Sequence, residues 1–192
     1  NQLLRLAQQG VRIWDLDSCY VSPWTTIGRG TELLPGVMLT GCNSVGSGCT
    51  IGPDTYLSDC SVADGARVMS SRGEHAVIGP DCEVGPFANL RPGTRLGPAV
   101  KAGAFVEMKE AQVAHLAYLG DATLGQDCNI GCGVATANFD RVDKHETVLE
   151  DSAFVGCHTS LVAPVRVGQG AYIAAGSVIT QDVPPGALGL AR

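Results

Sequence analysis

Aliphatic residues recur at every sixth position along most of the chain. The period holds in three runs: Ile27, Leu33, Leu39, Val45, Ile51 and Leu57; Ile78, Val84, Leu90 and Leu96; and Leu149, Val155, Leu161, Val167, Ile173 and Ile179. Gly commonly follows the aliphatic residue, and a small residue commonly stands four positions after it. Such hexads predict a parallel β-helix, in which each hexad gives one short strand and one turn and about three hexads close a coil. Ordinary alternating strands do not keep so long a period without a slip.

The ends of this ladder carry different patterns. Residues 1–13 predict a short helix whose apolar face is formed by Leu3, Leu4 and Ala7, with Gly10 ending it. Residues 11–24 read as an extended lead-in. Its three aromatic residues are expected to cover the open end of the core: Trp14, Tyr20 and Trp24.

The pattern therefore divides the chain into a linker helix and lead-in cap (1–24), a β-helix (25–183) and a C-terminal tail (184–192). The tail begins at Pro-Pro-Gly and is expected to leave the ladder from residue 187. Two polar stretches interrupt the hexads. Residues 69–77 predict a longer corner, and residues 136–148 predict a loop extruded from the coil, where a functional site is commonly built.

Composition narrows the class of protein. The 192 residues include 25 Gly and only 5% aromatic residues, which favours tight turns over a helical bundle. The net charge is −6 and no Lys/Arg run is present, which argues against a nucleic-acid partner, so an acidic substrate needs local cations. No run approaches about 18 apolar residues, and no signal peptide is recognisable, so we expect neither membrane insertion nor export.

The eight cysteines are scattered through the chain and form no Cys-x-x-Cys motif. This spacing disfavours a disulfide framework and a structural zinc site. Cys49, Cys82 and Cys128 occupy a repeat position that is otherwise held by small residues. We therefore expect them to be reduced and mostly inward, as in a cytosolic protein.

Four stretches carry a specific resemblance. They are Gly85–Gly93 (Gly-Pro-Phe-Ala-Asn-Leu-Arg-Pro-Gly), Phe105–Lys109 (Phe-Val-Glu-Met-Lys), His115–Asp121 (His-Leu-Ala-Tyr-Leu-Gly-Asp) and Asn129–Gly131 (Asn-Ile-Gly). Together they resemble the acetyltransferase domain of the bifunctional bacterial glucosamine-1-phosphate N-acetyltransferases / N-acetylglucosamine-1-phosphate uridyltransferases. These belong to the hexapeptide-repeat acyltransferases, and the similarity covers nearly the whole chain.

The resemblance implies an all-β fold, a left-handed parallel β-helix with a short N-terminal helix. It also implies acetyl transfer from acetyl-CoA to the amine of glucosamine 1-phosphate. The product would serve UDP-N-acetylglucosamine, peptidoglycan and lipopolysaccharide synthesis. The family is cytoplasmic and packs three chains into a homotrimer with sites between chains. Its Mg-dependent uridyltransferase half has no counterpart in this sequence, so the resemblance implies a longer parent, and this domain needs no metal.

The same resemblance assigns the site residues. His115 corresponds to the general base that takes the amine proton, a role suited to the pKa of histidine. Five residues correspond to sugar-phosphate contacts: Arg91, Lys109, Tyr118, Asn129 and Lys144, the last from a neighbouring chain. Six correspond to acetyl-CoA contacts: Cys132, Asn138, Phe139, Cys157, Ala175 and Arg192. Phe139 replaces the usual Tyr, and Cys132 and Cys157 replace Ala and Ser.

One departure bears on the geometry of the site. Between Lys109 and His115 the family carries about six more residues, which is one hexad. Loss of a hexad from a three-sided coil turns everything after it by one side, so that Arg91 and Lys109 no longer face His115 and Asn129. Either the sequence as written omits a loop, or the deletion is real and the site is remodelled. The intact motifs on both sides favour the omission.

Three other functions remain to be weighed. A hexapeptide acyltransferase with a different acceptor is disfavoured by the motifs around Lys109 and Tyr118. A zinc carbonic anhydrase on this fold needs three converging His ligands, but His75, His145 and His158 lack the expected spacing. A catalytically silent trimeric scaffold is kept open by the missing hexad. A catalytic role for Cys132 or Cys157 is disfavoured because neither has a recognised His partner.

Overall fold

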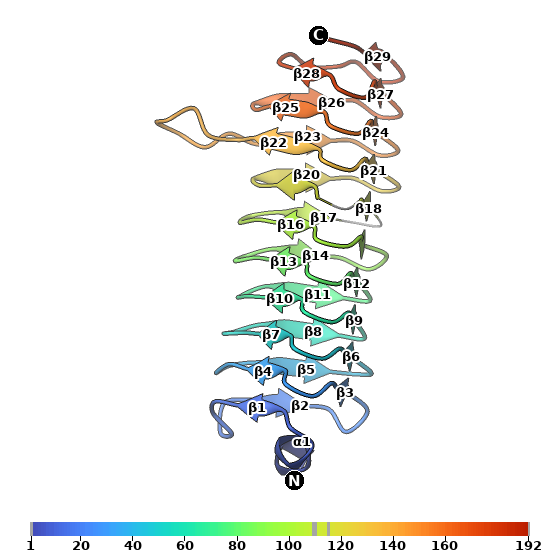
Figure 1. Ribbon diagram of the computed structural model, residues 1–192. Coiled ribbons are helices and arrows are strands. Elements are labelled where there is room, and N and C mark those ends of the chain that lie inside the picture. The colour runs from blue at the N-terminus through green and yellow to red at the C-terminus, as the bar shows by residue number, and fades with distance from the viewer. Residues whose placement is uncertain (1, 109–110, 115, 192) are drawn as a thin grey trace.

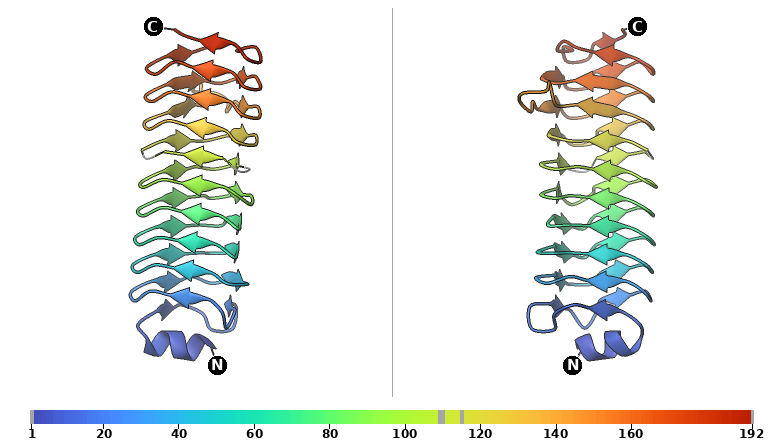
Figure 2. Two further views of the ribbon diagram at one scale, coloured as in Figure 1. Left: turned by 90° about the vertical axis from the view of Figure 1, so that its right-hand side faces the viewer. Right: turned by 60° about the vertical axis from the view of Figure 1, so that its left-hand side comes forward.

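Three parallel sheets, one on each side of a triangular coil, make up almost the whole molecule (Figure 1). The computed structural model describes residues 2–108, 111–114 and 116–191. Successive strands up to β28 belong to the three sheets in turn, so each strand pairs with the strand three further along the chain, and β29 joins the third sheet beside β27. The views in Figure 2 show the coils stacked in a straight column with the chain ends at opposite ends. The parallel β-helix predicted from the hexads is confirmed.

The first sheet contains ten of the described strands. They are β1 (Arg12–Ile13), β4 (Glu32–Leu33), β7 (Thr50–Ile51), β10 (Arg67–Val68), β13 (Glu83–Val84), β16 (Lys101–Ala102), β19 (Tyr118–Leu119), β22 (Ala135–Ala137), β25 (Ser160–Val162) and β28 (Val178–Ile179). Among the described residues the second sheet has nine. They are β2 (Tyr20–Val21), β5 (Met38–Thr40), β8 (Tyr56–Ser58), β11 (Arg72–Glu74), β14 (Asn89–Leu90), β17 (Glu107–Met108), β20 (Ala122–Leu124), β23 (Thr147–Leu149) and β26 (Val165–Val167).

The third sheet again has ten strands in the described ranges. They are β3 (Thr26–Ile27), β6 (Ser44–Val45), β9 (Ser61–Val62), β12 (Val77–Ile78), β15 (Arg95–Leu96), β18 (Gln112–Val113), β21 (Asn129–Ile130), β24 (Phe154–Val155), β27 (Tyr172–Ile173) and β29 (Leu188–Gly189). In a typical two-residue strand the first side chain faces solvent and the second faces the interior, which explains the six-residue period.

The core is a single column of stacked aliphatic side chains. Leu33, Ile51 and Leu57 are fully buried, and the hexad aliphatics above them follow the same pattern. Burying one such side chain stabilises the fold by roughly 1.5–3 kcal/mol, and each coil buries its aliphatics only against its neighbours. The fold is therefore stabilised by stacking, one coil upon the next.

The Gly that follows the aliphatic residue is explained by close stacking more than by an unusual backbone conformation. Gly28 does not have a positive φ, but a Cβ added to it would lie 2.5 Å from the carbonyl carbon of Gly46 in the next coil. A side chain at this corner would therefore push neighbouring coils apart. Close stacking therefore explains Gly28, whereas Gly52 and Gly85, which also follow an aliphatic residue, have positive φ values of 112° and 100°.

The three cysteines at the small repeat position are buried and free, as predicted. Their thiols donate to backbone carbonyls of the next coil, for example Cys82 Sγ to Gly97 O at 3.0 Å and Cys128 Sγ to Glu150 O at 3.1 Å. Burial raises the pKa of the Cys49, Cys82 and Cys128 thiols, because the charged form would lose its hydration. These three residues are packing elements.

The N-terminal end is covered by helix α1 (Gln2–Gln8), followed by Gly10 at φ +95°. The buried face of the helix is Leu3 and Leu6, whereas Leu4 and Ala7 are exposed, so the predicted face was partly wrong. The predicted aromatic cap was also wrong. Its three residues are 53–74% exposed: Trp14, Tyr20 and Trp24. Two leucines of a helix suffice to cover the small cross-section of one coil.

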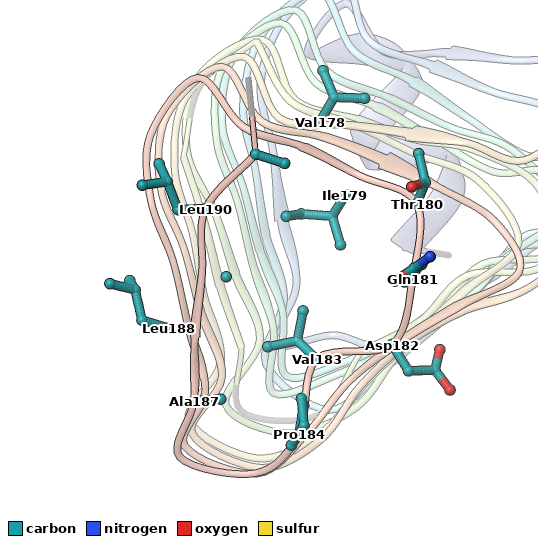
Figure 3. Close-up of a pocket in the computed structure, with 12 residues that line it drawn as sticks. Val178, Ile179, Thr180, Gln181, Asp182, Val183, Pro184, Ala187, Leu188 and Leu190 are labelled. Carbon is teal, nitrogen blue, oxygen red and sulfur yellow. The ribbon is translucent and has the colours of Figure 1, made fainter.

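The lead-in and the tail both belong to the ladder. Strands β1 and β2 pair with β4 and β5, so the first coil begins at residue 12. At the other end β29 pairs with β27, with Tyr172 opposite Leu188, so the expectation that the tail leaves the ladder was wrong. Figure 3 shows this last coil, with Ile179 and Val183 pointing inward and Leu188 and Leu190 pointing outward.

The two predicted interruptions had opposite outcomes. Residues 69–77 contain β11 and the start of β12 and continue the coil, so no longer corner forms there. The chain between β22 and β23 leaves the column as a long loop, as predicted (Figure 1). The β-helix continues without a break at the base of this loop, because Ala135 pairs with Ser160 in the next coil of the same sheet. Within the described residues no helix has the length and apolarity to cross a membrane.

Candidate active site

The extruded loop returns to the column at the corner between the first and second sheets. Tyr118 lies on β19, and Asp121 lies at the corner that leads into β20. Asp121 has a φ of 45°, a left-handed conformation that Asp adopts more easily than most residues. Asn138 and Lys144 come from the two ends of the loop. Residues from two separate segments of the chain thus meet at one corner, and we call Tyr118, Asp121, Asn138 and Lys144 the Asp121 cluster.

The Asp121 carboxylate is the centre of this cluster. Its Oδ2 accepts a hydrogen bond from Asn138 Nδ2 and lies 3.9 Å from Lys144 Nζ. The Tyr118 hydroxyl and Asn138 Nδ2 both flank Gly120, each 3.0 Å from the place where a Cβ on that Gly would stand. The Asp121 side chain is only 16% exposed, whereas that of Lys144 is 56% exposed. The carboxylate therefore fixes an amide while leaving the cation accessible to an anionic ligand.

An aromatic pair stands beside the cluster. Phe87 and Phe105 stack with ring centroids 5.4 Å apart, and both rings are exposed. Phe105 lines a shallow depression together with Asp121, Lys144, His145 and Glu146. The depression thus combines an apolar wall, one lysine and two carboxylates. Phe139 is 61% exposed and pairs through its backbone with Lys144 across the loop.

A carboxylate–imidazole pair holds the tip of the loop. His145 Nε2 lies 2.8 Å from Asp140 Oδ2, and Asp140 Oδ1 accepts the backbone N–H groups of Val142 and Asp143, each at 2.8 Å. The hydrogen bond from His145, followed by the two backbone bonds, holds the pKa of Asp140 well below its usual range. The charged carboxylate therefore organises this turn.

Three of the predicted acetyl-CoA contacts form a column at the corner after the third sheet. Cys132, Cys157 and Ala175 each stand two residues after a strand end, in β21, β24 and β27. Backbone bonds join the levels, from His158 N to Cys132 O and from Gly176 N to Cys157 O, both 2.8 Å. These residues lie one above another on consecutive coils.

Other predicted residues lie apart from these two groups. Arg91 follows β14 of the second sheet and pairs with Glu107, with Nη1 3.1 Å from Oε1. Asn129 is exposed on β21 of the third sheet, and Tyr118 is on the first sheet. Within one chain, then, Arg91, Tyr118 and Asn129 occupy three different sides. Lys109, His115 and Arg192 lie outside the described residues.

The short segment between the motifs fits an ordinary coil. Glu107–Met108, Gln112–Val113 and Tyr118–Leu119 fall in the second, third and first sheets, the same cycle as elsewhere. Glu107 pairs with Thr123, sixteen residues on, which equals the step from Arg67 to Glu83. The sequence as written thus closes without an additional hexad. This register belongs to the sequence as written, so the preferred interpretation, an omitted loop, stays a prediction, and Lys109 and His115 themselves lie outside the described residues.

Sequence reasoning missed Asp121 as the centre of the site. The residue closes the motif His-Leu-Ala-Tyr-Leu-Gly-Asp, and that position was the available signal. It also missed Thr136, whose buried Oγ1 accepts from Gly120 N at 2.9 Å and donates to Gly120 O at 3.0 Å. This pair of bonds ties β22 to the corner that carries Asp121. Over the part of the chain that the structure describes, no group of three or more His, Cys, Asp or Glu side chains converges as metal ligands would.

Comparison with curated proteins finds close relatives. The chain is 50% identical over 192 residues to "Bifunctional protein GlmU" of Nocardia farcinica, covering 97% of this chain and 39% of that protein. It is 44% identical over 189 residues to the protein of the same name from Geobacillus sp., covering 95% of this chain and 41% of that protein. The chain thus spans about two fifths of the length of these relatives. No family model matches it.

A solved structure shares the fold. The UDP-N-acetylglucosamine acyltransferase from Campylobacter jejuni superposes with a TM-score of 0.50 at 19% identity, covering 93% of this chain and 72% of that chain. At this identity the likeness concerns the β-helix alone.

Proposed function

We propose that this chain, which belongs to one family with the matching part of the GlmU proteins, transfers the acetyl group of acetyl-CoA to the amine of glucosamine 1-phosphate. The product, N-acetylglucosamine 1-phosphate, would serve the synthesis of UDP-N-acetylglucosamine and of cell-wall precursors in the cytoplasm. The similarity at 44–50% identity over nearly the whole chain supports this assignment. It concerns this chain alone and leaves the second activity of the longer relatives aside.

The reaction needs a neutral amine, a base and a cationic site for the phosphate. The amine nitrogen attacks the thioester carbonyl carbon, the C–S bond breaks, and CoA leaves as a thiol. His115 takes the proton that the amine loses, because an imidazole is neutral and basic near pH 7. The accessible ammonium of Lys144 suits a phosphomonoester, and the Tyr118 hydroxyl suits the sugar hydroxyls.

The acetyl-CoA side uses the column of Cys132, Cys157 and Ala175 together with Asn138 and Phe139. Their small side chains on consecutive corners would form a strip along which an extended pantetheine arm can lie. The Asn138 amide is held by Asp121, so that its orientation is fixed before a ligand arrives. Arg192 would add a cation for a CoA phosphate. Phe139 lacks the hydroxyl of the usual Tyr and contributes only apolar surface.

The separation of Arg91 from Tyr118 supports a site shared between chains. The two residues lie on different sheets of one chain, so a pocket that uses both must bring a side of one chain against another side of its neighbour. A homotrimer of parallel β-helices provides such grooves. Lys109 and Asn129 would join the same shared site. In such a site the neighbouring chain can supply the cation that one chain directs elsewhere.

The observation that carries the proposal is the Asp121 cluster. A silent scaffold has no need of an Asn138 amide and an accessible Lys144 ammonium that share one half-buried carboxylate, with the Tyr118 hydroxyl beside Gly120. The convergence also makes another acyl acceptor less suitable than an anionic sugar.

The direct test is to incubate the purified chain with acetyl-CoA and glucosamine 1-phosphate and to quantify the acetylated sugar by mass spectrometry. Glucosamine and glucosamine 6-phosphate serve as matched acceptors that lack the anomeric phosphate. We expect product only, or far faster, with glucosamine 1-phosphate. Equal rates with all three acceptors would favour a different acceptor specificity, and no product with any would favour the silent scaffold.

A further inference from the structure

The acetyl-CoA column contains two cysteines on neighbouring coils. Cys132 follows β21 and Cys157 follows β24, and these strands pair with Ile130 opposite Val155. Each cysteine stands two residues beyond its paired aliphatic residue, so the two occupy equivalent positions one level apart. A backbone hydrogen bond of 2.8 Å from His158 N to Cys132 O ties the two corners together.

The spacing of coils suits a covalent bond between them. Stacked strands lie about 4.7–4.9 Å apart, which falls within the Cα–Cα range of about 4.4–6.8 Å for disulfides. The approach is close at this corner, because a Cβ added to Gly131 would lie 2.9 Å from Cys157 Cα. Cys157 is exposed, so a disulfide here is expected to be correspondingly easy to reduce.

The two thiols are also more accessible than the cysteines of the core. Cys157 is exposed and Cys132 is half-buried, whereas Cys49, Cys60, Cys82 and Cys128 are buried in the core. A hydrogen bond with the Cys157 side chain is the main cause that raises the pKa of the Cys132 thiol. Oxidants in solvent can therefore reach this pair and not the inward thiols.

We propose that Cys132 and Cys157 are a redox modification site, at which a peroxide converts the two thiols to a reversible intrachain disulfide between neighbouring coils. The thiolate of one cysteine attacks a peroxide oxygen and becomes a sulfenic acid, releasing water. The second thiol attacks that sulfur, the S–S bond forms, and a second water leaves, so two thiols are oxidised as one peroxide is reduced. A thiol reductant reverses the reaction by exchange.

The bond would have a functional consequence that rests on the proposed acetyl-CoA site. The disulfide replaces two separate thiols by a rigid bridge along the strip assigned to the pantetheine arm. Oxidation would then weaken acetyl-CoA binding and raise its KM, and reduction would restore it. An enzyme of precursor synthesis would thereby slow under peroxide without unfolding.

The test treats the reduced full chain with hydrogen peroxide, blocks remaining thiols, and maps tryptic peptides without reduction. The wild type is expected to yield residues 110–141 joined to residues 145–166, lighter by two hydrogens than the sum of the thiol peptides. The cross-link is expected to disappear in Cys132→Ala and in Cys157→Ser and to persist in Cys42→Ser, which removes an exposed cysteine elsewhere. Non-reducing gels should show the monomer band only.

Three results would overturn the site. One is a cross-link that survives in Cys132→Ala, since Cys128 shares the same tryptic peptide. Another is a cross-linked dimer on the gel. The third is oxidation of the wild type only to sulfinic acid. Because the pKa of Cys132 is raised, the rate of cross-linking should keep rising with pH up to and beyond the ordinary thiol value of 9.0.

The consequence for catalysis is tested separately, by KM for acetyl-CoA before oxidation, after it, and after reduction. A reversible rise in KM of tenfold or more supports it, and Cys42→Ser should behave as the wild type. If the reduced wild type is inert, the proposed function fails while the mapped cross-link still decides the modification site. If the cross-linked chain keeps its KM, the modification site stands and its place in acetyl-CoA binding is overturned.

Discussion

Asn138 and Asp121 are joined by a hydrogen bond from the amide Nδ2 to the carboxylate Oδ2, across the root of the extruded loop. The bond connects a residue assigned to acetyl-CoA with the corner that also holds Tyr118. It gives the loop a fixed starting point on an otherwise uniform column. The first prediction concerns this bond.

Asp121→Asn should lower kcat/KM for the acetyl transfer by roughly 10- to 100-fold. A hydrogen bond to a charged group contributes about 1.5–3 kcal/mol, and its loss frees the amide that would orient the acetyl donor. Steady-state kinetics with both substrates checks this. Asp127→Asn, an exposed acidic residue near the next corner, is the matched control and should be neutral. Equal effects of the two variants would contradict the assignment of Asp121.

His115→Asn should lower kcat by the roughly 10²–10⁴-fold that loss of a general base costs, and it should flatten the rise of rate with pH. His75→Asn is the control, since His75 is exposed on another corner. The measurement is a pH–rate profile of all three proteins. A variant that keeps the pH dependence of the wild type would show that another group takes the amine proton.

Arg91→Ala and Lys144→Ala should each be nearly inactive alone and should recover activity when mixed. A site shared between chains is restored wherever a chain that keeps Arg91 lies against a chain that keeps Lys144. Denaturing and refolding the two together, then assaying acetyl transfer, measures the recovery. The expected fraction is at most about a third of wild type. A mixture that stays as inactive as its components would place both cations in one chain.

Gly28→Ala should destabilise the fold by about 1–3 kcal/mol or more, because the added methyl would lie 2.5 Å from the backbone of the next coil. Gly48→Asn is the control. Its φ of +65° suits Asn, and a Cβ there meets nothing within 4 Å. Thermal denaturation followed by circular dichroism compares the two. A larger loss for Gly48→Asn would mean that turn conformation matters more than stacking distance.

The stability of the turn at Asp140 should depend on pH, because the pKa of this carboxyl is lowered in the folded chain. A depressed carboxyl pKa adds stability that is complete above the unfolded value of 3.8 and is lost as pH falls through the folded value. The amide resonances of Val142 and Asp143, which donate to Asp140, should therefore hold their positions at neutral pH and move only below about 3.8. Asp140→Asn should show the shifted resonances at pH 7.

Much of the β-helix was predictable because the six-residue period of its aliphatic residues is visible in the sequence. Leu33, Leu39 and Val45 stand six apart since one hexad makes one side, and burial follows from that geometry. Handedness had to come from the resemblance, because spacing is the same for either hand. The aromatic cap failed for a physical reason. Trp14 and Trp24 are hydrophobic, but the coil is too narrow to need them.

The site was predictable only where local motifs define it. Tyr118, Asn138 and Lys144, which the resemblance indicated, lie together at one corner, and their roles in binding stay predictions. Asp121 was missed because its contacts come from a loop that leaves the column near residue 138 and returns. The side of the coil on which Arg91 lies could not be predicted from its motif. Which side of a coil a residue faces depends on every strand counted between it and its partner.

The loop between β22 and β23 shows how the column treats additions of different kinds. Ala135 still pairs with Ser160 although 25 residues separate them, against 17 from Tyr118 to Ala135. An insertion at a corner therefore leaves the orientation of all later coils unchanged. A gained or lost strand would instead turn every later residue to a different side of the column. Corners of this column are therefore the places where evolution, or an engineer, can graft new peptide without resetting the rest.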